Sequence, residues 1–184
     1  TRRLDILITE GSRDIVNEAF RVLRSNIDFM SSGDAGHNVF VLTSFNPGSG
    51  KSFIAMNLAT SFAIKGKRVL VIDGDLRHGS TSSYVSNPKH GLTDYLSGQQ
   101  SDIKSLLVTS SSNSSLDVLP IGKVPPNPTE LLENGRLAEV LTALRGSYDY
   151  IFNDCPPIDI VADTQIIEKF ADRTIFVVRA GLLE

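Results

Sequence analysis

The sequence is poor in the features that mark secreted, membrane-spanning or nucleic-acid-binding proteins. Its single cysteine, Cys155, excludes a disulfide within the chain and agrees with a reducing cytoplasm. No apolar run approaches the roughly 18 residues that a membrane span needs. A net charge of −3 offers no electrostatic case for binding nucleic acid, so we expect no nucleic-acid partner.

The beginning of the chain also lacks expected features. TRRLDILITE contains no initiator methionine, no apolar signal core and no cleavage pattern. We therefore interpret the chain as a piece of a longer protein, and a membrane segment could lie in the missing part. Residues 1–184 are enough for one domain with its own core. With 41% apolar and 21% charged residues, the composition is typical of soluble globular proteins.

The pattern of apolar runs predicts the fold class. Each run is short and uniformly apolar, as in strands that are covered on both faces. Helical segments separate most of them, which favours a doubly wound α/β domain with a mainly parallel sheet and helices on both faces. The five predicted strands lie at 39–44, 68–73, 116–120, 149–154 and 173–179.

Three further segments have local signals. Apolar residues at spacings of four, three, four and three predict a helix over 14–30, with a packing face of Val16, Phe20, Leu23, Ile27 and Met30. The serine-rich segment 109–115 is typical of a surface loop. Asn127, followed by Pro128 and Glu130, predicts a helix start with a capping box.

The segment NPGSGKS, between a predicted strand and a predicted helix over 52–66, is typical of a phosphate-binding loop. Gly48 and Gly50 allow backbone amides to turn inward, Lys51 would reach the β and γ phosphates, and the Ser52 hydroxyl would bind Mg²⁺. Phe45 stands where the strict pattern requires glycine. The segment predicts a site for a nucleoside triphosphate with Mg²⁺, with contacts from Pro47, Gly48, Ser49, Gly50, Lys51, Ser52 and Phe53.

Acidic residues follow two of the predicted strands. Asp73 and Asp75 come at the end of VLVIDGDLR, and Asp154 ends YIFND. The carboxyl ends of the strands form the edge at which open α/β sheets bind ligands. Carboxylates there can hold a hydrated Mg²⁺ or accept a proton, and Asp154 occupies the place of the acidic residue that orients Mg²⁺ in P-loop enzymes. Cys155 is expected to be a buried neighbour rather than a nucleophile, because no histidine is near it in sequence.

Together these motifs resemble those of the bacterial tyrosine kinases (BY-kinases), the cytoplasmic domains that regulate capsular and exopolysaccharide export. The family carries a modified phosphate loop without the first glycine, a D-x-D-x-R motif after three apolar residues, and D-x-P-P at the end of a later strand. Here these are NPGSGKS, VLVIDGDLR and DCPP. EAFRVLR fits the family's E-x-x-R-x-x-R, and GKVPPNPTELL resembles its G-x-x-P-P-N-P-x-E-L-L. The five motifs occur in the family's order between residues 14 and 180.

The resemblance implies a protein-tyrosine kinase with a P-loop NTPase fold that uses ATP and Mg²⁺. Lys51 and Ser52 would serve the phosphates and the metal, Asp73 would be the base near the incoming tyrosine hydroxyl, and Asp75 and Asp154 would organise Mg²⁺. Arg77 could add positive charge or be structural. The resemblance places the kinase at the cytoplasmic side of the bacterial inner membrane, with a fused or separate membrane-embedded polysaccharide export or chain-length protein as its partner.

The helix at 14–30 carries the motif that the family associates with ring-like self-assembly. At 100° per residue, Glu18, Arg21 and Arg24 lie roughly 200°, 140° and 80° from the centre of the apolar stripe. We expect all three to point away from the core and to form an interface between subunits, although a solvated charged face is the alternative.

The chain departs from the family in its tyrosines. The family ends in a tyrosine-rich tail that neighbouring subunits phosphorylate, but this sequence stops at VVRAGLLE. Tyr148 and Tyr150 begin a predicted strand, whereas Tyr84 and Tyr95 lie in looser surroundings and are the only acceptors expected within the chain.

Two alternatives remain open. A partitioning-type or septum-positioning ATPase switch would share the fold and the acidic motifs, but that group has a second lysine at the position of Asn46. A nucleotide-sensing assembly module with little catalysis would oligomerise on binding ATP and regulate a transporter. Transfer of label from ATP to a tyrosine peptide would separate a kinase from both.

Overall fold

A computed structural model describes residues 6–31, 38–158 and 161–181. The first five and the last three residues lie outside this part, and so does most of the polar segment before the first strand. The interpretation of the chain ends therefore concerns residues that the structure does not describe. In the described part of the chain, no helix is long and apolar enough to cross a membrane.

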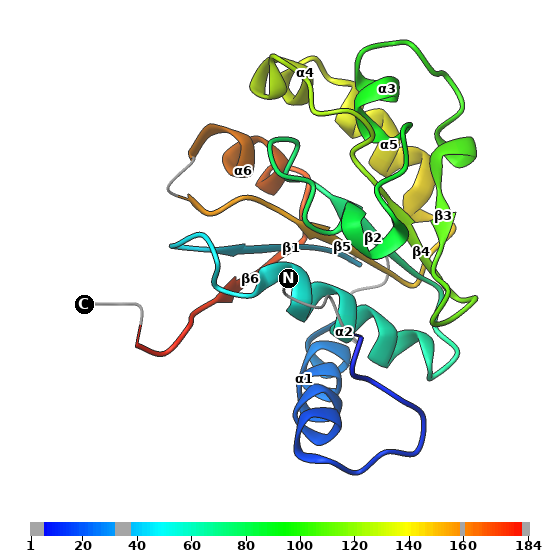
Figure 1. Ribbon diagram of the computed structural model, residues 1–184, viewed down its shortest axis with the longest axis vertical. Helices are drawn as coiled ribbons and strands as arrows, with labels where there is room; N and C mark the ends of the chain where they lie inside the picture. Colours follow the sequence, from blue (N-terminus) through cyan, green and yellow to red (C-terminus); the bar gives the residue numbers. More distant parts are fainter. Residues whose placement is uncertain (1–5, 32–37, 159–160, 182–184) are drawn as a thin grey trace.

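The described residues form one six-stranded sheet flanked by helices (Figure 1). The strand order is β3-β4-β2-β5-β1-β6, and all neighbours are parallel except β3 and β4. This arrangement confirms the doubly wound α/β prediction. The strands are β1 (Val39–Ser44), β2 (Val69–Asp73), β3 (Val108–Thr109), β4 (Leu116–Leu119), β5 (Tyr150–Asp154) and β6 (Arg173–Val177).

Five of these strands match the predicted ones, whereas β3 was not predicted. β3 is only two residues long, and it pairs with β4 through Val108↔Val118 and Thr109↔Asp117. The serine-rich segment that follows makes the turn between the two strands, and the Ser110 N–H donates to the Leu116 carbonyl at 2.8 Å. The prediction of a surface loop over 109–115 is therefore wrong at its start, since Thr109 is in a strand and Ser110 is buried.

Helices cover both faces of the sheet, as Figure 1 shows. Successive side chains of β1 point to opposite faces of the sheet. Phe40 and Leu42 belong to an apolar cluster with α1 and α2 on one face. Val39 and Val41 belong to a second cluster with α3 to α6 on the other face. The helices are α1 (Ile15–Ser31), α2 (Lys51–Ala63), α3 (Leu92–Leu96), α4 (Pro128–Glu133), α5 (Arg136–Arg145) and α6 (Val161–Glu168), with short 3₁₀ turns η1 (Ser82–Val85) and η2 (Ile103–Leu106).

Helix α1 confirms the predicted helix, and its packing face is nearly the predicted one. Phe20 and Ile27 are buried against α2 and the sheet. Met30, however, is 49% exposed. It lies about 60° around the helix from Ile27, at the margin of the stripe, so its inclusion in the packing face was wrong.

The predicted helix after Asn127 is broken into two, α4 and α5, at Gly135, which has a φ of 85°. The capping box is also absent. The Asn127 side chain makes no cap hydrogen bond, and its Nδ2 donates instead to Glu130 Oε2 at 2.9 Å. Because the two side chains bond to each other, neither reaches the backbone N–H groups that a capping box would satisfy.

Candidate functional site

The phosphate-loop segment lies between β1 and α2, as predicted. Gly48 and Gly50 have φ values of 74° and 92°, a region that side chains with a Cβ rarely adopt. A Cβ at either position would meet no atom within 4 Å, so the backbone conformation and not crowding requires glycine there. Gly50 is also the N-cap of α2 and offers no side chain to the first N–H groups of that helix. These donors remain available for an anion.

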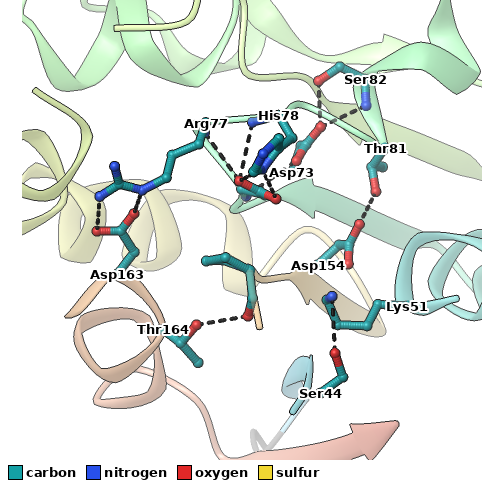
Figure 2. Close-up of polar contacts among 12 residues, drawn as sticks. Ser44, Lys51, Asp73, Arg77, His78, Thr81, Ser82, Asp154, Asp163 and Thr164 are labelled. Atoms are coloured by element: carbon teal, nitrogen blue, oxygen red, sulfur yellow. Dashed lines mark hydrogen bonds and ion pairs between the residues drawn. The ribbon is translucent and has the colours of Figure 1, made fainter. Parts of the chain in front are cut away.

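The Lys51 side chain reaches from this loop to the end of β1. Lys51 Nζ donates to Ser44 Oγ at 3.2 Å, and Figure 2 shows the lysine extending beneath Asp154. Phe45, in the place of the missing glycine, is 52% exposed and packs edge-on against Phe176, with ring centroids 4.7 Å apart. The absent glycine therefore leaves the loop geometry intact, since the aromatic side chain projects away from the buried strand.

The two acidic strand ends lie side by side because β2 and β5 are neighbours in the sheet. Asp73 and Asp154 are register partners at the last position of their strands. Both carboxyl groups are buried, and Asp75, two residues after the end of β2, is 8% exposed. The sequence prediction that these three residues gather at one edge of the sheet is confirmed.

Burial raises the pKa of Asp73 from its ordinary 3.8 to about 7, and the neighbouring Asp154 carboxylate adds to the effect. Burial also raises the pKa of Asp154, against hydrogen bonds from Ser52 and Thr81 and the positive charge of Lys51. The thiol of Cys155 is fully buried and its pKa is raised by that burial, as expected of a structural neighbour.

Two residues that hold these carboxylates were missed from the sequence. Thr81 Oγ1 donates to Asp154 Oδ2 at 2.6 Å, and the backbone N–H and hydroxyl of Ser82 donate to Asp73 Oδ2 at 2.7 and 2.6 Å (Figure 2). The Ser82 oxygen also accepts the Ile121 N–H at 2.9 Å. The hydroxyls of GSTSS, a few residues after the acidic pair, were the available signal, but serine is too common in turns to single out.

The described residues fit a hydrated Mg²⁺ better than a closed metal cage. No three His, Cys, Asp or Glu side chains converge on one point in the ranges that the structure covers. Mg²⁺ needs no such cage, because it binds through one or two carboxylates, water and phosphate oxygens. Asp154 Oδ1 is buried and has no hydrogen-bond partner within the described part of the chain, which is the condition expected of an oxygen that a cation would satisfy.

The loop after β2 is held in a tight turn. Asp75 Oδ1 accepts the Arg77 and His78 N–H groups, both at 3.2 Å, and His78 Nδ1 lies 3.0 Å from Asp75 Oδ2. The Arg77 guanidinium binds Asp163 through Nε at 2.9 Å (Figure 2). Of the two roles left open for Arg77, the structure therefore favours the structural one.

The predicted interface residues lie on α1, apart from this site. Arg21 pairs with Glu18 at 2.8 Å, and both side chains are more than 40% exposed. Arg24 does not point into solvent as expected, because its Nη1 donates to the carbonyl and to the hydroxyl of Ser61, both at 2.9 Å. At about 80° from the stripe centre, its long side chain can reach back onto α2.

The tyrosines are less accessible than the sequence suggested. Tyr95 is buried and its hydroxyl donates to Glu139 at 3.2 Å, so the expectation of looser surroundings was wrong. Tyr84 is half-buried against the cluster of α1 and α2. Burial raises the pKa of both Tyr148 and Tyr150, and each hydroxyl donates to an aspartate. All four side chains are engaged in the fold.

Comparisons with known proteins agree with this geometry. Residues 37–181 match the family model described as an AAA domain. Tyrosine-protein kinase YwqD of Bacillus subtilis (strain 168) is 39% identical over 181 residues, which cover 97% of this chain and 74% of YwqD. Tyrosine-protein kinase wzc of Salmonella typhimurium is 36% identical over 179 residues, which cover 97% of this chain but 24% of wzc. The chain thus spans about a quarter of the length of several curated relatives.

A solved structure extends the likeness to three dimensions. The kinase domain of the Escherichia coli tyrosine kinase ETK matches with a TM-score of 0.90 and 31% identity, over 100% of this chain and 71% of that one. The likeness therefore covers the phosphate loop, both acidic strand ends and α1 together.

Proposed function

This chain belongs to the AAA-domain family and, within it, to the bacterial tyrosine-protein kinases, and from that premise we propose that it transfers the γ-phosphoryl group of ATP to tyrosine hydroxyls. The observation that carries the proposal is the pairing of Asp73 with Asp154 at the strand ends beside the phosphate loop. Phosphoryl transfer requires positioning and neutralisation of charge, and little covalent chemistry from the protein.

In this proposal the phosphate loop holds the triphosphate. The backbone N–H groups around Gly48 and Gly50 face the phosphates at the start of α2, and Lys51 adds a charge-assisted contact. Ser52, Asp75 and Asp154 bind Mg²⁺, whose charge offsets that of the phosphates. The unpartnered oxygen of Asp154 supports this role. Pro47, Ser49 and Phe53 complete the proposed nucleotide contacts.

Asp73 is the proposed base. Its pKa of about 7 is matched to proton transfer at neutral pH, whereas an ordinary carboxylate would be a weaker acceptor. Ser82 donates twice to Oδ2 and so fixes the orientation of the carboxyl group. The second oxygen, Oδ1, accepts a longer contact of 3.3 Å from the Asp75 N–H. Oδ1 is therefore the better placed of the two to receive a proton.

The setting of the kinase is part of the same proposal. We propose that residues 1–184 act as a single kinase domain, with 14–30 as its assembly helix. Relatives such as wzc are about four times as long as the matched segment, which supports a fused or separate membrane-embedded polysaccharide export or chain-length partner. The domain would then work at the cytoplasmic side of the bacterial inner membrane, in rings of its own subunits.

Transfer of label from ATP tests the function. We expect this chain to phosphorylate a separate chain that carries a tyrosine-rich tail, and to label itself weakly, because its four tyrosines are engaged in the fold. Asp73→Asn is expected to lower the transfer rate by roughly 10²-fold or more, with nucleotide binding retained. Mass spectrometry that finds no phosphotyrosine on any supplied tail, or strong labelling of Tyr150, would contradict the proposal.

A further inference from the structure

Outside the acidic triad, three side chains from distant parts of the sequence meet in one hydrogen-bonded group. Arg77 follows β2, Thr129 lies in the first turn of α4, and Asp163 lies in the first turn of α6. Arg77 Nε donates to Asp163 Oδ2 at 2.9 Å, and Thr129 Oγ1 donates to Asp163 Oδ1 at 2.6 Å. Arg77 Nη2 contacts Thr129 Oγ1 at 3.0 Å and Asp163 Oδ1 at 3.4 Å.

Asp163 is the buried centre of this group. Its side chain is 0% exposed, whereas the Arg77 side chain is 37% exposed. Both carboxylate oxygens are occupied, and within the described ranges the side-chain donors that reach them come from Arg77 and Thr129. Burying a carboxylate costs desolvation energy, which its hydrogen-bonded partners must offset. Asp163 therefore depends on Arg77 and Thr129 for its buried position.

The group connects directly to the proposed metal carboxylate. The backbone N–H of Arg77 donates to Asp75 Oδ1, and the Gly79 N–H donates to the Asp75 carbonyl at 2.9 Å. The turn over 75–79 thus wraps around Asp75, and the Arg77 side chain fixes the outside of the turn to α4 and α6. Figure 2 shows the guanidinium directed away from Lys51, toward Asp163.

We infer that Asp163 and Thr129 are positioning residues that act through Arg77 to hold the Asp75 carboxylate in place for Mg²⁺. The inference depends on the proposed function at one point, the assignment of Asp75 to the Mg²⁺ site. It also gives a role to the threonine of PPNPTELL, a stretch that the proposed chemistry does not otherwise use. Residues that orient a metal-binding group typically change metal affinity 10- to 100-fold when they are replaced.

The test measures metal dependence apart from catalysis. Mn²⁺ affinity in the presence of ADP, followed by electron paramagnetic resonance, is compared for the wild-type chain, Asp163→Asn, Arg77→Ala and the double variant. We expect each single variant to weaken Mn²⁺ binding roughly 10-fold, with ADP affinity in the absence of metal unchanged. Because Asp163 acts through Arg77, the double variant should be no weaker than the weaker single one.

Asp172→Asn is the matched control. Asp172 is also largely buried and bound to an arginine, with Arg145 Nη1 at 3.3 Å, but it lies at the opposite edge of the sheet, where its Oδ2 accepts the N–H of Val39. The Asp172→Asn substitution should lower the free energy of unfolding and leave Mn²⁺ affinity unchanged. Thr129→Val is a milder variant for the case in which Asp163→Asn does not fold, with a smaller loss in the same direction.

Unchanged Mn²⁺ affinity in a folded Asp163→Asn or Thr129→Val protein would overturn the inference. So would losses that multiply in the double variant, or an equal loss in Asp172→Asn. Tyrosine transfer is measured separately on the same wild-type protein. A chain that shows the predicted metal effects but phosphorylates no tyrosine would refute the proposed function and support the positioning role.

Discussion

The strand ends of the sheet and the outer side of α1 both carry charged residues, but under opposite conditions. Asp73 and Asp154 are buried and held by Ser82 and Thr81. On α1, the Glu18–Arg21 pair is exposed, and the same helix carries exposed apolar side chains at Ile15, Val22 and Phe29. Folding alone fixes the geometry of the first region. The second is the proposed contact surface between subunits, so substitutions there should act on association and little on the monomer.

Among the substitutions that test this comparison, the largest effect is expected for Lys51→Met, in the phosphate loop beside the strand ends. Losing one charge-assisted phosphate contact removes roughly 1.5 to 3 kcal/mol, so Mg·ATP affinity should fall at least about tenfold in a calorimetric titration. The fold should persist, because Lys51 is only partly buried and its side chain bonds to the Ser44 hydroxyl. Lys65→Met, which removes an exposed lysine just after the same helix, is the control. Equal Mg·ATP affinities for wild type, Lys51→Met and Lys65→Met would show that Lys51 does not contact the phosphates.

The pH dependence of stability tests the burial of Asp73 at the strand ends. Asp73 has a pKa of about 7 when folded and about 4 when unfolded, so between these values the folded protein keeps a proton that the unfolded chain has lost. This contribution to stability is full below about pH 4 and is lost as the pH rises through about 7. As the pH rises from about 4 to about 7, we therefore expect the free energy of unfolding of Asp73→Asn to increase relative to that of wild type.

Urea unfolding without nucleotide, at several pH values, measures that difference. Because Asp154 is present in both proteins, only the difference between their curves reports on Asp73. Parallel curves for wild type and variant would show that Asp73 is solvated in the folded protein. Glu18→Gln, on the exposed face of α1, is the surface control.

A smaller effect separates two arginines of α1. Arg24→Ala removes two hydrogen bonds to Ser61 and should lower the free energy of unfolding by about 1 kcal/mol. Arg21→Ala removes an exposed ion pair and should change it by less than about 0.5 kcal/mol, while it lowers the oligomer population seen by light scattering. If Arg21→Ala left the oligomer unchanged at every concentration, the proposed interface would have to lie elsewhere.

The smallest effect is expected for Asn127→Ala. A side chain that capped α4 would contribute about 1 kcal/mol, but the Asn127 side chain makes no cap hydrogen bond and bonds instead to Glu130. The change in the free energy of unfolding should therefore stay within about 0.5 kcal/mol. Thermal unfolding compares this variant with Asp102→Ala, since Asp102 does accept the Lys104 N–H at the start of η2. A larger loss for Asn127→Ala would show that the cap forms in solution.

Most of the fold and the centre of the candidate site could be predicted from the sequence. Strands covered on both faces appear in the sequence as unbroken apolar runs, and glycines just before a lysine and a serine mark a phosphate loop. The parallel sheet then brings the ends of β2 and β5 together whatever the loops between them do. The gathering of Asp73, Asp75 and Asp154 therefore follows from the strand pattern.

The parts that could not be predicted depend on contacts between segments distant in sequence. Thr81 and Ser82 are ordinary turn residues until the fold places them on the carboxylates, and nothing near Asp163 signals its bond to Arg77. The direction of Arg24 was misjudged because helical geometry gives the angle of a side chain but not its reach. β3 was missed because two residues carry no periodicity.

The position of β1 has a consequence for the timing of synthesis. β1 lies between β5 and β6, and Val39 is paired with Ile151, more than one hundred residues later. At about 5–20 residues per second, a ribosome needs roughly 5 to 20 s to reach β5 after it has made β1. Until then the strand that leads into the phosphate loop has neither neighbour, and the emerging chain must keep a strongly apolar segment from binding to other chains.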